Sequence, residues 1–222
     1  MPVDRERHEG EAFSYACLRC RRCCSNKRIQ INPYEAERLA RGRGETTAAF
    51  RERWTLDGHG VVLRQTPQGA CVFLGPEGCT VHADRPLVCR LYPVGRHISP
   101  EGRVWFTDVD LHPPPGGLFG EAGTIAAYLE NQGAGPFIAA ADAYFFWFGR
   151  AIRAFQSHAD ENETPSDEAP FEDLLDLGAV VAQHCLAQGR AEPEDIEARR
   201  ELHLEILYAR LYEMEEADGT QA

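Results

Sequence analysis

The stretch that decides the fold is Cys17-Leu-Arg-Cys20-Arg-Arg-Cys23-Cys24, which places four cysteines within eight residues. Two residues between successive cysteines allow one tight loop to direct several sulfur atoms at a single metal centre. The adjacent Cys23 and Cys24 are expected to point in different directions. This favours either a polynuclear site or one ligand with a supporting thiol. Redox-active thiols without a metal are the alternative explanation for the stretch.

Three further cysteines, Cys71, Cys79 and Cys89, lie downstream and must fold back if all seven act together. Seven thiolates exceed what one tetrahedral ion requires. They suit a [4Fe–4S] cluster with extra thiols, two zinc ions, or a polynuclear zinc or iron cluster with bridging thiolates. Spacing alone does not select the metal. Cys185 stands apart from the others and is expected to be an ordinary buried thiol.

Length and composition limit the class of protein. The chain has 222 residues, enough for a substantial core, and its net charge of −12 argues against non-specific binding of nucleic acid. It has no apolar run of about 18 residues, so no membrane span is expected. Its polar N-terminus lacks the apolar region of a signal peptide. We therefore expect a cytoplasmic protein, in which clustered cysteines indicate metal or redox chemistry rather than disulfides.

Charge is unevenly distributed along the chain. Residues 17–53 carry ten Lys and Arg against four Glu, whereas residues 159–222 carry four Arg against eighteen Asp and Glu. The basic segment coincides with the first cysteine group. Neutralisation of thiolates explains it, and a docking surface for an anionic substrate or partner is the alternative. The acidic C-terminal part is expected to be a solvated helical face.

Hydrophobic periodicity and capping residues predict a mainly helical α+β protein. In this fold a small irregular cysteine-cluster domain, with short strands around a metal centre, is covered by C-terminal helices. Asn32 and Pro33 predict the start of a helix that runs to residue 42. The other expected helices cover residues 46–54, 125–130, 137–156, 171–188 and 193–216, with a single turn at 87–93. The expected strands are 28–32, 61–65, 70–74 and 103–108.

This pattern suggests five segments. They are a flexible lead-in (1–16), the cysteine-cluster metal-binding domain (17–130), a buried helix that completes the core (131–157), a polar linker (158–169) and an acidic helical hairpin (170–222). Core packing is the favoured interpretation of the aromatic-rich helix at 137–156. A pocket for a flat ligand is the alternative.

The ordered spacing of the cysteines is more specific than any single pair. C-x2-C-x2-C-C is followed by Cys71-Val-Phe-Leu, by Gly78-Cys79-Thr-Val-His and by Arg85-Pro86-x2-Cys89-Arg90-x-Tyr92-Pro93. Over roughly residues 17–130 the chain resembles the YkgJ-like cysteine-cluster proteins, a family described as a zinc- or iron-chelating domain that includes flagellin lysine N-methylases. The resemblance implies that the metal site is built by Cys17, Cys20, Cys23, Cys24, Cys71, Cys79 and Cys89.

Two histidines are further candidate ligands. Many family members carry another cysteine after the third strand, where this chain has His112 followed by three prolines, so His112 is a candidate replacement; a plain surface residue is the alternative. His82 lies three residues after Cys79 and is a candidate ligand or a neighbour of one. Arg85, Arg90 and Tyr92 are expected around the ligands, where arginine offsets thiolate charge and donates hydrogen bonds to sulfur. Alternatively, Arg85 pairs with a carbonyl or carboxylate and holds the turn.

The expected function is a metal-binding protein with a cysteine-ligated zinc or iron centre, with a [4Fe–4S] cluster as one form. The alternatives are a redox or methyltransferase-type enzyme that uses an iron–sulfur cluster, and a metal carrier or sensor. The nucleotide-binding glycine motifs and the C-x3-C-x2-C spacing of radical S-adenosylmethionine enzymes are absent from the sequence. No catalytic residue is assigned, and the expected partner is a protein or a small molecule.

Overall fold

The computed structural model describes residues 5–18, 20–109, 116–158 and 173–219. Within them the chain is mainly helical, which confirms the predicted α+β class. The helices are α1 (Pro33–Gly42), α2 (Thr47–Trp54), α3 (Leu87–Leu91), α4 (Ile125–Asn131), α5 (Gly135–His158), α6 (Leu177–Ala187) and α7 (Ile196–Gly219). Short 3-10 helices are η1 (Arg22–Cys24), η2 (Leu56–Gly58), η3 (His82–Asp84) and η4 (Asp173–Leu175).

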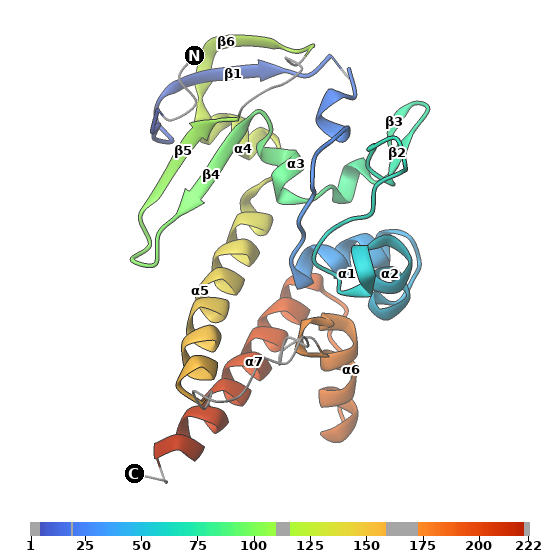
Figure 1. The fold of residues 1–222 in the computed structure, drawn as a ribbon, viewed down its shortest axis with the longest axis vertical. Coiled ribbons are helices and arrows are strands. Elements are labelled where there is room, and N and C mark those ends of the chain that lie inside the picture. The colour runs from blue at the N-terminus through green and yellow to red at the C-terminus, as the bar shows by residue number, and fades with distance from the viewer. Residues whose placement is uncertain (1–4, 19, 110–115, 159–172, 220–222) are drawn as a thin grey trace.

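The described strands form three separate antiparallel pairs, β1 with β6, β2 with β3, and β4 with β5. Their bounds are β1 (Ala12–Ala16), β2 (Leu74–Gly75), β3 (Gly78–Cys79), β4 (Val94–Ile98), β5 (Val104–Asp108) and β6 (Leu118–Thr124). The pairs β1–β6 and β4–β5 lie at one end of the molecule, and α5 and α7 run together towards the other end (Figure 1). The β2–β3 hairpin, which carries Cys79, lies to the right of the strand pairs in this view, above α1 and α2 (Figure 1).

Local capping explains where the helices begin. At α1, Asn32 and Glu35 form a reciprocal capping box, and Pro33 occupies the first turn. The side chain of Thr46 accepts a hydrogen bond from the Ala49 amide and starts α2. The helices predicted at residues 33–42 and 46–54 are therefore confirmed.

The C-terminal helices are part of the main core. Aromatic and aliphatic side chains of α5 and α7 pack with Tyr34 of α1 in one buried cluster. A second cluster of buried side chains joins α6 to α7, and α6 also contacts α1 and α2. The expected acidic hairpin is therefore packed against the rest of the molecule, because its helices have apolar inner faces. Most of the expected linker, from residue 159 onward, lies outside the described residues.

Several expected strands are different in the structure. Within residues 28–32, 61–65 and 70–73 the chain forms only isolated bridges, such as Gln30 with Val62 and Gln65 with Cys71, while Leu74 belongs to β2. Residues 12–16, expected in a loose lead-in, form β1, because they pair with β6 from a distant part of the chain. Strands β4 and β6 were not expected. Among the described residues, no helix combines the length and apolar character that crossing a bilayer requires.

Candidate metal centre

The first cysteine group lies in a short turn after β1. Cys17 follows the strand and is exposed, and Arg21 has a left-handed φ of 64°, which tightens the chain between Cys20 and Cys23. Cys23 and Cys24 lie in η1, with their Sγ atoms 3.8 Å apart. A tetrahedral metal with bonds of about 2.3 Å to sulfur places its ligand sulfurs ~3.8 Å from each other. This pair therefore has the spacing of two ligands of one ion, although their adjacency in sequence predicted divergent directions.

Backbone hydrogen bonds bring the second cysteine group to the first. The Cys71 amide donates to the Cys24 carbonyl over 2.7 Å, and the Asn26 amide donates to the Gly69 carbonyl over 2.7 Å. Cys79 follows in the β2–β3 hairpin, opposite Leu74, and Cys89 lies within α3. The downstream segment therefore folds back onto the first cysteine group, as a shared site requires.

One cavity of about 1040 Å³ collects most of these thiols. Six of the seven cysteines line it: Cys17, Cys20, Cys23, Cys24, Cys79 and Cys89. Cys71 is outside the lining, although its charge acts on Cys24 and Cys89. Within the described residues, no group of three or more His, Cys, Asp or Glu side chains is arranged to hold a metal ion. The seven-cysteine ligand set therefore stays a prediction.

Two glycines of the segment before β6 fit closely against the first cysteine group. The Gly116 amide donates to Cys20 Sγ over 3.2 Å, and a Cβ at Gly116 would lie 2.8 Å from Cys20 Cβ. A Cβ at Gly117 would overlap the Tyr15 ring. These glycines therefore allow a backbone N–H to reach a candidate ligand sulfur, and such bonds orient and tune metal thiolates.

The electrostatics of the thiols favour a cation. The thiol of Cys24 donates to Cys23 and lowers the pKa of Cys23 to about 7, while the same bond raises the pKa of Cys24. Burial raises the pKa of Cys71, Cys79 and Cys89, and the neighbouring cysteines add to the rise. Crowded thiols cannot all lose their protons, because the resulting thiolates repel one another. A bound metal cation offsets that repulsion. The donor set therefore fits a thiophilic metal.

The expected surrounding residues take different roles. Arg85 donates to the His82 carbonyl over 2.7 Å and to Gln132 Oε1 over 2.8 Å, and its charge opposes the rise in the pKa of Cys79. Buried Arg90 donates to the carbonyls of Arg85, Gln132 and Ala83. Arg85 therefore both holds the turn and offsets thiolate charge, whereas the hydrogen bonds of Arg90 hold the backbone around α3.

The remaining candidates can also be placed. Tyr92 lines the cavity, and burial together with nearby Cys23, Cys20 and Cys17 raises the pKa of Tyr92 to about 12. His82 is exposed and lines the cavity together with Cys79. His112 lies outside the described residues. Ligation by either histidine stays a prediction.

Glu35 is a residue that the sequence analysis missed. It lines the cavity, and its carboxylate accepts the Asn32 amide over 2.9 Å and the Leu87 amide over 2.5 Å. It thereby joins the start of α1 to the start of α3, the helix that carries Cys89. Burial raises the pKa of Glu35 to about 7. The spacing of Asn32 and Glu35 is a capping-box signal and would have marked this residue.

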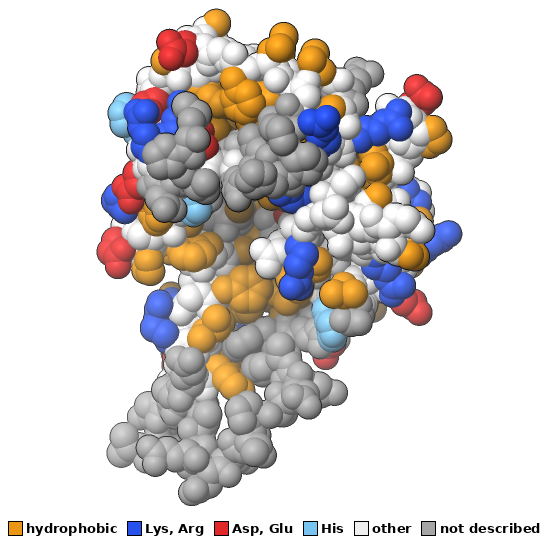
Figure 2. All heavy atoms as spheres, turned by 45° about the horizontal axis from the view of Figure 1, so that its top comes forward, with side chains coloured by type: hydrophobic (Ala, Val, Ile, Leu, Met, Phe, Trp, Pro, Cys, Tyr) orange, Lys and Arg blue, Asp and Glu red, His pale blue; other side chains and the backbone are white. Residues whose placement is uncertain are grey.

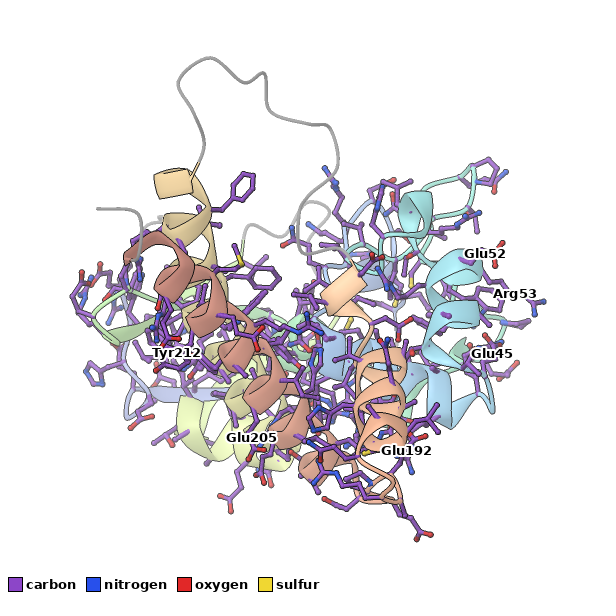
Figure 3. All side chains as sticks on the ribbon, turned by 90° about the horizontal axis from the view of Figure 1, so that it is seen from below. Glu45, Glu52, Arg53, Glu192, Glu205 and Tyr212 are labelled. Carbon is purple, nitrogen blue, oxygen red and sulfur yellow. The ribbon has the colours of Figure 1, made fainter. Side chains whose placement is uncertain are left out.

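Charge on the surface follows the division expected from the sequence. In Figure 2, hydrophobic side chains gather in the middle of the face shown, with Lys and Arg side chains on either side. The basic residues Arg21, Lys27 and Arg28 line the cavity. Acidic residues of the C-terminal part are exposed, such as Glu192 in the loop between α6 and α7 and Glu205 on α7 (Figure 3). The cavity therefore has a basic rim that is separate from the acidic helical face.

Comparison with known proteins gives one finding. Residues 16–107 match the model of the CxxCxxCC family, described as a "putative zinc- or iron-chelating domain". This match covers less than half of the chain and ends earlier than the resemblance over roughly residues 17–130. No curated protein and no solved structure showed significant similarity to the chain. Over residues 16–107 the chain is therefore similar to the family that the cysteine pattern indicated.

Proposed function

We propose that this protein binds zinc or iron in a polynuclear, thiolate-ligated centre within the cavity. The family match supports metal binding in general. The observation that carries the finer proposal is that six cysteines from separate parts of the chain line one cavity, with Cys23 and Cys24 at tetrahedral spacing. Six thiols exceed the ligands of one tetrahedral ion, so bridging thiolates or a [4Fe–4S] cluster with extra thiols accounts for them.

The chain's own residues would hold the centre in place. The Gly116 amide orients the Cys20 sulfur, Arg85 offsets charge beside Cys79, and Glu35 fixes the helix of Cys89. When bound, an iron–sulfur cluster would supply electron transfer, whereas zinc would supply charge neutralisation. The thiols must stay reduced, which the cytoplasm provides.

The test is anaerobic purification followed by measurement of zinc, iron and acid-labile sulfide per chain. Cys23→Ser is expected to lose most of the metal, because it removes one member of the closely spaced pair. The matched control is Cys185→Ser, since Cys185 is buried in α6 among Leu177, Val181 and Leu202, and its metal content should equal that of the wild type. Equal metal content in both variants, or a wild type without metal, would contradict the proposal.

The measured ratios also identify the form of the centre. Iron with stoichiometric sulfide and broad visible absorption indicates the [4Fe–4S] form, and colourless protein with zinc alone excludes it. Enzyme activity and a carrier role stay predictions from the sequence. Removal of the metal by a mild chelator without unfolding would favour the carrier.

A further inference from the structure

The cavity extends well beyond the thiols. At about 1040 Å³ it reaches the upper end of the range for pockets that enclose organic ligands, roughly 300–1,000 Å³. A tetrahedral ion with bonds of ~2.3 Å, or a small cluster, occupies only part of that space. Its other wall is formed by α5, through Tyr144, Phe145 and Phe148. One cavity therefore joins the thiols to an aromatic surface.

Part of this aromatic wall is accessible to solvent. Phe145 is 39% exposed, and Phe148 is only partly buried, against the core cluster. Tyr144, in contrast, is fully buried, and its hydroxyl is bonded to His203 Nδ1 over 2.8 Å. Covering exposed aromatic surface with an apolar ligand is favourable because it releases water. The wall is therefore suited to a flat apolar group.

The cavity also carries cationic side chains that have no carboxylate partner within the described part of the chain. Among the residues that the structure describes, Arg21, Lys27 and Arg28 line the cavity and form no ion pair with a described carboxylate. Arg96 is neutralised by a bidentate pair with Asp142, at 2.6 and 2.8 Å.

Few carboxylates of the cavity lining are available to pair with these cations. Glu35 is occupied by two backbone amides, which leaves exposed Glu77 as the acidic counterpart among the lining residues. The excess of cations favours an anionic ligand.

We propose that the cavity binds a small organic anion with an aromatic body. The body lies against Phe145 and Phe148, and the anionic group lies towards Lys27 and Arg28. This inference rests on the proposed function in one respect, which is that the metal occupies the thiol end and leaves the aromatic end to the ligand. Neutralisation of thiolates alone would explain the cations, but it would not explain the aromatic wall that lines the same cavity.

The test uses the metal-loaded protein as purified and the fluorescent aryl sulfonate anilinonaphthalene sulfonate. We expect saturable binding of one dye per chain. Phe145→Ala should weaken it roughly ten-fold, which corresponds to ~1.4 kcal/mol. The matched control is Phe146→Ala, because Phe146 is also 39% exposed on α5 but does not line the cavity. It should change the dissociation constant less than about two-fold.

Charge is tested in the same titration. Arg28→Gln should weaken binding about three-fold and reduce its dependence on salt, because screening acts on the lost charge. Its control is Arg210→Gln, an exposed arginine of α7 away from the cavity. Uncharged phenylnaphthylamine should bind more weakly than the sulfonate. Metal content is measured in every sample.

The outcomes separate this inference from the function on which it rests. Absence of saturable dye binding to protein that carries metal overturns the inference and leaves the metal centre standing. Equal weakening by Phe146→Ala also overturns it, as does equally tight binding of the uncharged dye. If the protein carries no metal, the proposed function fails, and the dye titration still decides whether the pocket exists.

Discussion

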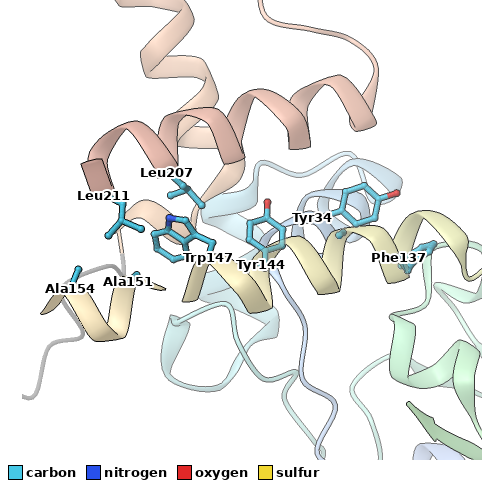
Figure 4. Close-up of a cluster of buried hydrophobic side chains, with 9 residues drawn as sticks. Tyr34, Phe137, Tyr144, Trp147, Ala151, Ala154, Leu207 and Leu211 are labelled. Carbon is cyan, nitrogen blue, oxygen red and sulfur yellow. The ribbon is translucent and has the colours of Figure 1, made fainter. Parts of the chain in front are cut away.

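The cysteine segment and the helical core are held together by different means. In the helical core, Trp147 is 1% exposed, and α5 places it with Tyr144 against Leu207 and Leu211 of α7 (Figure 4). Among the described residues of 17–28, in contrast, none is buried, and η1 contains no buried side chain. A few backbone hydrogen bonds fix this segment to residues 69–71.

The difference shows where each part obtains its stability. Burial of apolar surface stabilises the helical core without any ligand. The cysteine segment instead places thiols close together, where their charges oppose one another. For such a segment, the free energy of metal binding is free energy of folding. The account therefore predicts that changes in the two parts have separable effects.

The largest effect is expected from truncation of the helical core. Trp147→Ala should lower the free energy of unfolding by about 3–5 kcal/mol, because it removes a large buried ring and leaves a cavity. Urea denaturation followed by circular dichroism measures this loss. The metal bound per folded chain should not change, and a loss of metal in folded Trp147→Ala protein would show that the two parts are not separable.

The next effect concerns acid. His203 is buried, its Nδ1 is bonded to Tyr144 and its Nε2 to the Leu174 carbonyl, and burial lowers the pKa of His203 to about 4. In the unfolded chain the pKa of His203 is ~6.5, so the unfolded state takes up the proton first as the pH falls. The contribution of His203 to the free energy of unfolding should therefore be fully present above pH ~6.5. It should decrease by up to about 3 kcal/mol as the pH falls towards 4.

This acid sensitivity is checked by denaturation of the wild type and His203→Gln across the same pH range. Glutamine does not titrate, so the variant should lose less stability between ~6.5 and 4 than the wild type does. Identical pH dependence in the two proteins would remove His203 as the cause.

A smaller effect is expected at the junction of α1 and α3. Glu35→Ala leaves the partly buried amides of Asn32 and Leu87 without their acceptor, which should cost about 2 kcal/mol. Glu130→Ala is the control, since Glu130 is exposed on α4, and it should change little. The difference between the two urea midpoints measures the effect, and equal midpoints would contradict the assigned role of Glu35.

The smallest effect tests a link between the β4–β5 pair and the helical core. The pair Arg96–Asp142 joins β4 to α5 with two hydrogen bonds. A double-mutant cycle with Arg96→Ala and Asp142→Ala should give a coupling energy of about 1 kcal/mol, since the pair is partly exposed and screened by water. A coupling of several kcal/mol would contradict this estimate and would mean that β4 is tied strongly to α5.

Local signals in the sequence predicted the helices well and the strands poorly. The Asn32–Pro33 cap and the apolar periodicity of residues 137–156 are local, so α1 and α5 could be located. The bridge between Gln65 and Cys71 and the pairing of β1 with β6 depend on contacts that no local pattern encodes. A stretch that pairs at only one residue can have the composition of a strand but lacks the regular geometry of one, so composition alone predicts a strand there wrongly.

The sequence singled out the cysteines as candidate donors, but it did not indicate how they are arranged. The spacing identified the seven cysteines, and the fold places six around one cavity. The close approach of Gly116 to Cys20 could not be foreseen, because it joins residues far apart in the chain. The aromatic helix at 137–156 packs Trp147 into the core, which is the favoured interpretation, while Phe145 lines the cavity. Binding of a flat ligand there stays a proposal.

The central claim is that metal holds the cysteine segment while apolar packing holds the helices. Hydrogen exchange of metal-loaded and chelator-stripped protein tests it most directly. The account predicts that the amides of Asn26 and Cys71, which bridge the two cysteine groups, lose protection when the metal is removed, while those of α5 and α7 keep it. Unchanged protection at Asn26 and Cys71, or equal loss in α5 and α7, would contradict the account.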